Sequence, residues 1–418
     1  MTKKVQLITL VGFLTGILFA SSQVLDEVNP PEEIRSIVFK SKNEGDQFPI
    51  IKLGDQITLE FDDLTANEND YYYKITHCNY DWTPSDLMKQ QYLEGIDNQR
   101  IITYLNSYNT LQPYSHYTLT LPNRFSSFKI TGNYLLSIYN RFDELLFSRK
   151  FIIYKDAVSV GAVVKRGRDL STIETQQRLQ FTINNNGFEL VNPQQEVKVA
   201  ILKNYYWPGA ITNLKPQFYS GNQLIYKYDE ESSFNGENEY LFFDTKDIRA
   251  SNSGINRIQL NDLYEHFLFR DRIRSGLDYT FYPDINGDFF IQILDVEDPD
   301  TEADYSIVHF SLEYEDLIGL NEVYVFGKYN NYDLNEENKL KFNENNGLLE
   351  TEILMKQGVY NYKYVMKNDK GELITYAISG NHFETENQYL IIVYYRNFGD
   401  MYDSIIGIGT ASSINISN

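Results

Sequence analysis

The chain has 418 residues, of which 42% are hydrophobic and 15% aromatic, and its formal net charge is −21 at pH 7. A chain this acidic is repelled by nucleic acid and by anionic lipid, so we expect neither as a partner. Its single cysteine, Cys78, excludes an internal disulfide, and packing must therefore supply the stability of the fold.

The N-terminus has the pattern of a secretory signal peptide. Lys3 and Lys4 precede an apolar run from Val5 to Phe19, and the small residues Ala20–Ser22 then offer a cleavage site. The run is too short and wrongly flanked for a stable membrane span, so we expect residues 1–22 to be removed on export to the periplasm. Their loss removes two lysines and no acid, which changes the formal charge from −21 to −23. The alternative is an uncleaved N-terminal anchor.

Most of the remaining chain alternates apolar and polar residues with a period of two, as strands with one buried face do. The clearest stretches are Ile57–Phe61, Tyr117–Leu121, Leu179–Ile183 and Val197–Ile201. Asn-Gly pairs, which can adopt the positive φ angles of a tight hairpin turn, begin at Asn186, Asn235, Asn286 and Asn346. Short strands with recurring turn signals predict an all-β fold of sandwiches or barrels.

Helical signals are few. Thr83–Met88 contains a cap residue, a proline at the first helical position and an acid in the first turn, which predicts a short helix running to Gly95. Leu260–Ile273 is the second segment expected to contain a helix.

The length predicts two or three domains after the signal peptide. We divide the chain into an N-terminal β-sandwich domain at 23–155, a middle β domain at 156–302 and a C-terminal domain at 303–418. The acidic stretch Asp295–Asp300, at the end of the middle range, is expected to be a linker or an exposed loop.

The motifs that would indicate catalysis or a bound metal are weak. The five histidines are far apart in sequence, no cysteine pair exists for zinc, and neither a Gly-x-Ser-x-Gly elbow nor a phosphate loop occurs. Asp284–Asp288 resembles a calcium loop only faintly, and a turn capped by acids is the better interpretation. We therefore expect no enzyme and predict no catalytic, cofactor-binding or metal-binding residue. A hydrolase remains the enzymatic alternative.

Glu322–Met366 resembles the early-set immunoglobulin-like sandwich of glycogen- and starch-binding modules. Those modules carry a strand, then Gly-x-Phe-Asn-x-Trp, then Gly-x-Tyr-x-Tyr-Lys, and the chain has Gly327–Tyr332 and Gly358–Lys363 at these places. The resemblance implies tandem immunoglobulin-like or early-set β-sandwich domains with few short helices. Tyr332 stands where the sugar-stacking tryptophan is usual. A carbohydrate-binding protein that uses the C-terminal sandwich is the alternative function.

Several stretches together resemble one family, the plug proteins of the type IX secretion system of Bacteroidota, whose N-terminal part is catalogued as a domain of unknown function. The matching stretches are Ile50–Gly54, Leu59–Leu64, Tyr71–Ile75, His77–Ser85, Ser107–Thr110, Tyr114–Tyr117, Leu121–Asn123, Gly132–Tyr134, Trp207, Glu239–Asp244, Thr385–Tyr389, Tyr394–Arg396 and Tyr402–Gly407. Glu239-Tyr240-Leu241 departs from the usual Glu-Phe-Arg, and Ser404 replaces a usual arginine.

The resemblance implies a role without bond chemistry. A plug protein sits at the inner face of the outer membrane and closes the periplasmic mouth of a giant outer-membrane β-barrel translocon. The chain is then expected to be a monomer within a heteromeric complex, with no cofactor and no membrane span. A secreted cargo protein is a further alternative.

Aromatic side chains are the expected contacts with such a partner, since they dominate interface hot spots. The candidates are Tyr71, Trp82, Tyr205 and Trp207, chosen because they flank expected loops. The alternative is that both tryptophans belong to the core.

Overall fold

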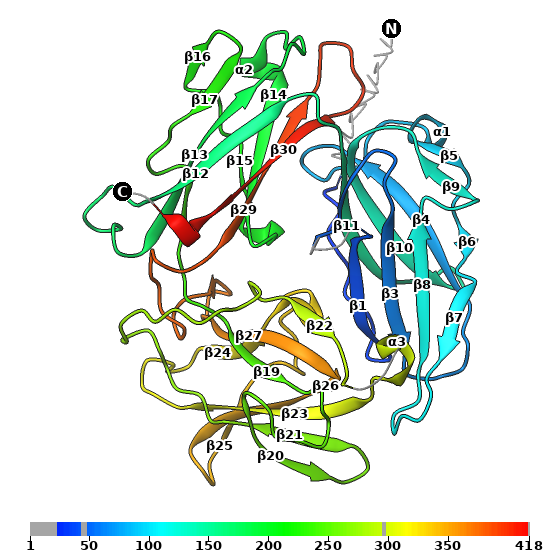
Figure 1. Cartoon of the computed structure of the whole chain (residues 1–418), viewed down its shortest axis with the longest axis vertical. Helices are drawn as coiled ribbons and strands as arrows, with labels where there is room; N and C mark the ends of the chain where they lie inside the picture. Colours follow the sequence, from blue (N-terminus) through cyan, green and yellow to red (C-terminus); the bar gives the residue numbers. More distant parts are fainter. Residues whose placement is uncertain (1–22, 43–47, 295–297, 417–418) are drawn as a thin grey trace, which may run out of the picture.

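The computed structural model describes residues 23–42, 48–294 and 298–416, so the expected signal peptide at 1–22 lies outside the described residues. The described part is nearly all β, which confirms the expected fold class of sandwiches with few short helices (Figure 1). Its α-helices are single turns: α1 (Lys89–Tyr92), α2 (Pro193–Glu196) and α3 (Pro299–Glu302). None of the helices in these residues has the length and apolar character needed to cross a bilayer.

The N-terminal unit is a sandwich of two main sheets. One has the order β1-β3-β8-β7 and the other β2-β11-β10-β4-β6, while β5 pairs with β9 beside them. The strands are β1 (Ile34–Ser41), β2 (Ile50–Lys52), β3 (Ile57–Asp63), β4 (Tyr71–Cys78), β5 (Leu93–Gly95), β6 (Gln99–Arg100), β7 (Thr103–Asn106), β8 (Ser115–Leu121), β9 (Ser126–Phe128), β10 (Gly132–Asn140) and β11 (Leu145–Tyr154).

The middle unit packs the sheet β12-β13-β17-β16, with β18 on β13, against the sheet β15-β14-β29-β30. The strands are β12 (Ser159–Arg166), β13 (Gln176–Asn184), β14 (Val197–Lys203), β15 (Ile211–Thr212), β16 (Phe218–Ser220), β17 (Gln223–Tyr226), β18 (Ser233–Asn235), β29 (Gln388–Tyr395) and β30 (Ser404–Ser412). A 3-10 turn, η1 (Trp207–Gly209), lies between β14 and β15.

The inserted unit lies between β18 and β29 in the chain. Its strand β27 pairs with β19, β22, β24 and β28, and its second sheet has the order β20-β21-β23-β26-β25. The strands are β19 (Leu241–Asp244), β20 (Ile255–Leu260), β21 (Tyr264–Leu268), β22 (Phe289–Ile291), β23 (Tyr305–Glu313), β24 (Glu322–Phe326), β25 (Lys341–Asn343), β26 (Leu348–Lys356), β27 (Gly358–Lys367) and β28 (Leu373–Ile374). The 3-10 turn η2 (Lys328–Asn330) precedes β25. A last 3-10 turn, η3 (Ser413–Asn415), follows β30 in the middle unit.

Strand pairing groups the second half of the chain differently from the expected ranges 156–302 and 303–418. The register of β14 with β29 runs from Val197 opposite Tyr395 to Lys203 opposite Tyr389, so the last two strands return to the middle unit. The physical reason is that β14 and β29 each bury both faces and complete one another's backbone hydrogen bonding. We therefore propose unit boundaries of 34–155, then 156–235 together with 388–416, and 236–387 for the inserted unit.

The period-two alternation places side chains as expected. In Ile57–Phe61, Tyr117–Leu121 and Leu179–Ile183 the apolar residues are buried and the residues between them are only partly buried. In the N-terminal core the ring of Phe61 stacks on Tyr117 at 5.2 Å and meets the edges of Tyr71 and Phe147 at 5.3 Å each. Aromatic packing of this kind carries the stability that a disulfide-free chain needs.

The two expected helices are largely wrong. Thr83 donates its backbone N–H and its hydroxyl to the Asp81 carboxylate, and this local turn replaces a helix start, so that only Lys89–Tyr92 is helical. Leu260 ends β20, which pairs with β21 as a hairpin, because burial of His266 and Leu268 on alternate positions favours a strand.

Two other local predictions have mixed outcomes. Asn186-Gly187 and Asn286-Gly287 adopt positive φ at both residues, whereas at Asn346-Gly347, the hairpin turn between β25 and β26, only the glycine does. Of the acidic stretch Asp295–Asp300, residues 295–297 lie outside the described residues, while Pro299–Glu302 form α3, where the Asp298 carboxylate accepts the backbone N–H of Asp300 and caps the turn.

Candidate interaction site at the junction of three units

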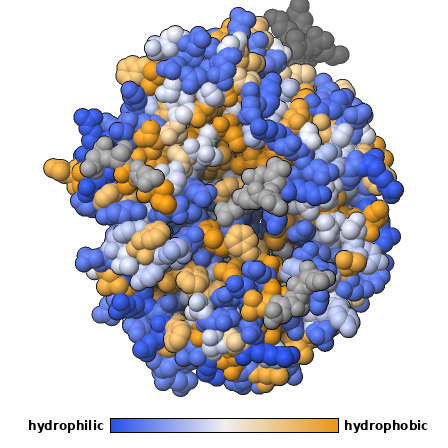
Figure 2. Space-filling model, viewed as in Figure 1, coloured by the Kyte–Doolittle hydropathy of each residue, from blue (hydrophilic) through white to orange (hydrophobic). Residues whose placement is uncertain are grey.

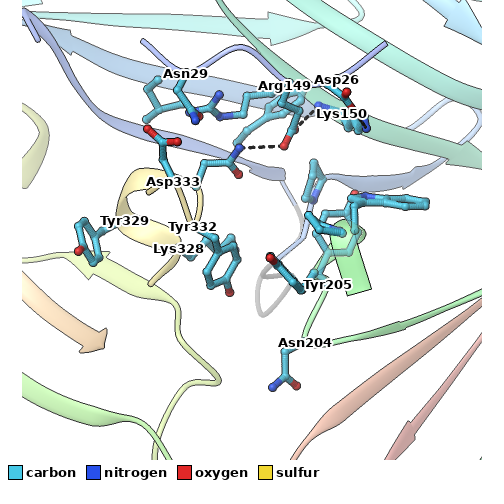
Figure 3. Close-up of a pocket in the computed structure, with 18 of the residues that line it drawn as sticks. Asp26, Asn29, Arg149, Lys150, Asn204, Tyr205, Lys328, Tyr329, Tyr332 and Asp333 are labelled. Carbon is cyan, nitrogen blue, oxygen red and sulfur yellow. Dashed lines mark hydrogen bonds and ion pairs between the residues drawn. The ribbon is translucent and has the colours of Figure 1, made fainter. Parts of the chain in front are cut away.

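A hollow lies where the three units meet. It is a pocket of about 420 Å³. Its walls come from the N-terminal arm, which is the segment 23–33 before β1, from β11, from the loop after β14, and from η2 and the residues that follow it (Figure 3). In the space-filling view, apolar residues gather towards the middle of the molecule, where the units adjoin (Figure 2). Because its lining residues come from three units, the contacts in this pocket help to hold those units together.

Three of the four aromatic residues singled out in the sequence meet at this pocket. The rings of Trp82 and Trp207 pack edge to face with centroids 4.8 Å apart, and Tyr205 lies 6.2 Å from Trp207. Phe48 stacks on Tyr205 at 4.8 Å. We call Trp82, Tyr205, Trp207 and Tyr332 the aromatic junction.

Tyr71, the fourth candidate, is not part of the aromatic junction. It is buried in the core of the N-terminal unit, where its hydroxyl donates to the Asp63 carboxylate at 2.9 Å. Trp82 is also buried, whereas Tyr205 and Trp207 are half-buried. These side chains therefore offer little free area to a partner, and packing between units is their visible role.

The backbone of the aromatic junction is unusual. Trp82, Tyr205 and Tyr332 have φ of 63°, 58° and 58°, in the left-handed region that bulky residues rarely adopt. They are the three aromatic residues with positive φ in the described part of the chain, and all line the same pocket. Such conformations cost on the order of 1–3 kcal/mol each and persist only where the surroundings enforce them. Sequence reasoning had no signal for this feature.

Charged groups surround the aromatic rings. The Lys150 ammonium lies 4.7 Å from the centroid of the Trp82 ring, which is a cation–π contact. Glu27, from the N-terminal arm, accepts the backbone N–H of Lys150 at 2.6 Å and the side-chain amide of Asn331 at 2.8 Å. Glu27 therefore links the N-terminal unit to the inserted unit. The described lining contains no histidine, cysteine or serine.

A buried polar network joins the N-terminal unit to the inserted unit. The Asp62 carboxylate on β3 accepts the Lys356 ammonium, the Tyr305 hydroxyl and the His116 Nδ1–H, each at 2.7 Å. Asp62 and Lys356 are both almost completely inaccessible to solvent. Removing one partner of such a pair costs about 3–5 kcal/mol, because the other charge stays buried.

The middle unit is fixed to both neighbours. Towards the N-terminal unit, the Tyr394 hydroxyl donates to the Asn133 side-chain oxygen at 2.9 Å, within an apolar cluster that includes Ile152. Towards the inserted unit, Glu237 pairs with Lys203 at 2.7 Å and with Lys363. Burial alone would raise the pKa of Glu237, but the two lysines together hold it well below its usual range. All three interfaces are thus locked by buried contacts.

Comparison with known proteins assigns the first unit. The family model described as the type 9 secretion system plug protein 1st domain matches residues 34–155, the range from the start of β1 to just after β11. A crystal structure of a hypothetical protein from Parabacteroides merdae ATCC 43184 is similar along almost the whole length. The two are 33% identical with a TM-score of 0.88, and the match covers 93% of this chain and 100% of that one. No curated protein matches the chain.

The plug family is a structural component of secretion machinery in the cell envelope and is not a known enzyme family. The resemblance drawn from the sequence stretches is thereby confirmed for residues 34–155. In its first domain, residues 34–155, the chain belongs to the family of type 9 secretion system plug proteins.

Proposed function

We propose that this protein is a non-enzymatic plug or gating subunit of the type IX secretion translocon. It seals the periplasmic mouth of the giant outer-membrane β-barrel, at the inner face of the outer membrane, as one copy within a heteromeric complex. The match of the first domain to the plug family supports the secretion role. The structure adds a mechanical argument for a stopper.

The observation that carries the proposal is the set of buried polar contacts at the junctions between units. A stopper fails if its parts move apart under load, so its units need contacts that do not exchange with water. The Asp62–Lys356 pair and the Glu237–Lys203 pair are such contacts, because each is largely buried and joins side chains from two units. Three sandwiches joined in this way present one broad, stiff surface to a partner.

Docking needs exposed apolar groups outside the aromatic junction. A stable interface buries on the order of 1,600 Å² and usually centres on a few aromatic or arginine anchors. Phe398, at the tip of the β29–β30 hairpin, is 94% exposed, and the neighbouring Met401 is 47% exposed. We take Phe398 as the first residue to probe for contact with the barrel.

The test has two parts. Gentle-detergent purification of the tagged protein from membranes should bring down a very large β-barrel protein. Deleting the gene should raise outer-membrane permeability to an antibiotic too large for ordinary porins, and the intact gene should restore the barrier. A tight envelope in the deleted strain, together with no barrel in the purification, would overturn the proposal.

No second function is proposed, because the carbohydrate-binding alternative needs an open aromatic ring for sugar stacking and the ring at that position is covered. Tyr332, at the position of the usual sugar-stacking tryptophan, packs against Tyr206 at 5.2 Å and against Phe326 at 4.9 Å. Sugar binding by stacking requires an open aromatic face, and here Tyr206 of the middle unit covers this ring.

A further inference from the structure

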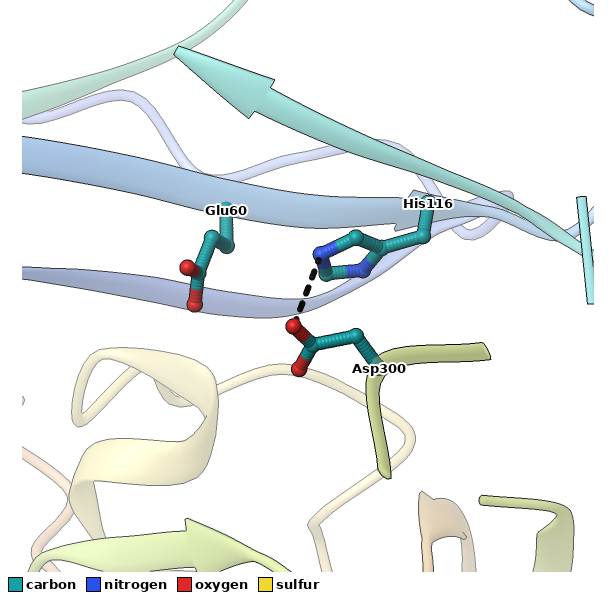
Figure 4. Close-up of side chains that lie close together, drawn as sticks. All are labelled: Glu60, His116 and Asp300. Atoms are coloured by element: carbon teal, nitrogen blue, oxygen red, sulfur yellow. Dashed lines mark ion pairs between the residues drawn. The ribbon is translucent and has the colours of Figure 1, made fainter. Parts of the chain in front are cut away.

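A separate group of side chains lies at the interface of the N-terminal and inserted units. Glu60 is on β3, His116 is on the neighbouring strand β8, and Asp300 is in α3 (Figure 4). One ligand atom from each lies within 4.8 Å of the others. We call these three residues the carboxylate–imidazole cluster.

The imidazole of His116 is held in one orientation. Its Nδ1 lies 2.7 Å from an oxygen of Asp62, a carboxylate that also accepts from Lys356 and Tyr305. Because an ionised carboxylate can only accept, Nδ1 carries a proton, and Nε2 is the ring nitrogen nearest to Asp300. The side chain of His116 is 8% exposed, and its Nε2 has no hydrogen-bond partner among the described residues. A buried ring nitrogen without a hydrogen-bond partner is costly unless something binds it.

The two carboxylates lie close to the imidazole of His116. An oxygen of Asp300 lies 4.0 Å from His116 Nε2, and the Asp300 side chain is 49% exposed. The cluster therefore places two carboxylates beside one imidazole.

We propose that Glu60, His116 and Asp300 bind a divalent first-row transition-metal ion, for which Zn²⁺ is the probe. One imidazole nitrogen and two carboxylate oxygens suit Zn²⁺, whereas Ca²⁺ and Mg²⁺ prefer oxygen ligands alone. Asp62 acts as the outer carboxylate that fixes the ring and its tautomer, as is usual for metal-binding histidines. The exposed side of Asp300 leaves a fourth position open to water.

Small movements bring the ligands to bonding distance. Bonds of ~2.0–2.1 Å in a tetrahedral site place neighbouring ligand atoms roughly 3.3 Å apart. The half-exposed Asp300 side chain is free to swing towards the fixed imidazole. Its backbone is already seated, because the Tyr114 hydroxyl donates to the carbonyl oxygens of Asp300 and Ala303 at 3.1 and 2.8 Å.

The ion would connect two units. Glu60 and His116 belong to the N-terminal unit and Asp300 to the inserted unit, so a metal held by all three staples the interface already formed by Asp62 and Lys356. Binding to the folded state alone stabilises that state by mass action.

The experiment is a Zn²⁺ titration of the purified, chelator-treated protein by calorimetry, with melting temperature as a second readout. We expect one ion per chain and a rise in melting temperature. His116→Asn keeps a donor near Asp62 but removes Nε2, and Asp300→Asn and Glu60→Gln each remove one carboxylate. Each should weaken binding at least ~10-fold and abolish the rise in melting temperature, while circular dichroism confirms the fold.

Matched control variants distinguish Zn²⁺ binding at this cluster from nonspecific binding to the acidic surface of the protein. His309→Gln removes a histidine that contacts Glu265 and Glu352 elsewhere in the inserted unit, and Glu302→Gln removes a carboxylate from α3 itself. Both should bind Zn²⁺ like the parent protein. The anomalous signal of zinc in a crystal should lie on the cluster.

Three results would overturn the proposal. They are no saturable Zn²⁺ binding by the folded parent protein, binding that survives all three cluster variants, and Ca²⁺ or Mg²⁺ binding as tightly as Zn²⁺. If Asp300→Asn fails to fold, the Glu60→Gln comparison and the position of the zinc signal still decide.

Discussion

The Lys356 ammonium lies 2.7 Å from the Asp62 carboxylate, with 1% and 0% of the two side chains exposed, although 294 residues separate them in the chain. Because β3 belongs to the N-terminal unit and β26 to the inserted unit, this ion pair stabilises the interface between the two units. The same carboxylate also orients His116, so Asp62 belongs both to the interface and to the surroundings of the proposed metal site.

Lys356→Met should destabilise the protein by about 3–5 kcal/mol, because Asp62 is left buried without its cation. Urea unfolding at pH 7 measures the change. The double variant Asp62→Asn with Lys356→Met should recover part of the loss, since no uncompensated charge remains. Lys52→Met, which breaks the exposed pair with Asp156, is the control and should leave the unfolding midpoint in place. Equal effects of the two lysine substitutions would contradict the buried-pair argument.

Trp82→Ala should cost about 3–5 kcal/mol in unfolding free energy, as expected for a buried tryptophan that packs on Trp207. The backbone adds a sharper comparison. Glycine normally destabilises relative to alanine, but at φ 63° it relieves a left-handed strain of roughly 1–2 kcal/mol. We therefore expect Trp82→Gly to be at least as stable as Trp82→Ala. A glycine variant clearly less stable than the alanine variant would show that the strain is absent.

The strands were predictable and the junctions were not. Alternation in Leu179–Ile183 is a local signal, and it identified the buried face correctly. Pairing of β14 with β29 joins residues nearly two hundred positions apart, and no local pattern records it. The helix predicted to run from Thr83 to Gly95 is largely wrong, because the Asp81 side chain accepts from Thr83 and forms a local turn instead.

The aromatic junction and the carboxylate–imidazole cluster also differ in how far the sequence could predict them. Trp82, Tyr205 and Trp207 were singled out from the sequence as aromatic residues near loops, and the structure brings them together, although as packing between units. The carboxylate–imidazole cluster was missed, because Glu60, His116 and Asp300 lie on three separate elements and have no motif spacing.

Two buried histidines should make stability depend on pH. Burial lowers the pKa of His77 and of His266 to about 4 each. Between about pH 6.5 and pH 4 the unfolded chain therefore binds protons that the folded chain does not, so stability falls as the pH falls. Each histidine contributes about 2–3 kcal/mol of this loss between pH 7 and pH 4.5.

Comparison with a variant isolates this effect. Glu239, whose pKa burial raises to about 7, contributes a slope of opposite sign, so the parent curve alone is a mixture. His266→Gln keeps a donor for the Ile248 carbonyl and removes the titrating ring, so it should flatten the loss of stability on acidification. Urea unfolding at pH 7 and pH 4.5 provides the measurement. An unchanged pH slope in the variant would show that His266 titrates normally in the folded protein.

Phe398→Ala should leave the fold intact and weaken docking, because the 94% exposed ring at the β29–β30 tip loses no packing when it is removed. Its unfolding midpoint should match that of the parent protein, while less β-barrel co-purifies from membranes. Leu170→Ala, at another exposed position in the middle unit with 90% exposure, is the matched control and should retain the barrel. If both variants co-purify with the barrel as the parent does, the docking face excludes this hairpin. If only Phe398→Ala loses it, an exposed aromatic ring outside the aromatic junction anchors the complex, as hot-spot energetics predict.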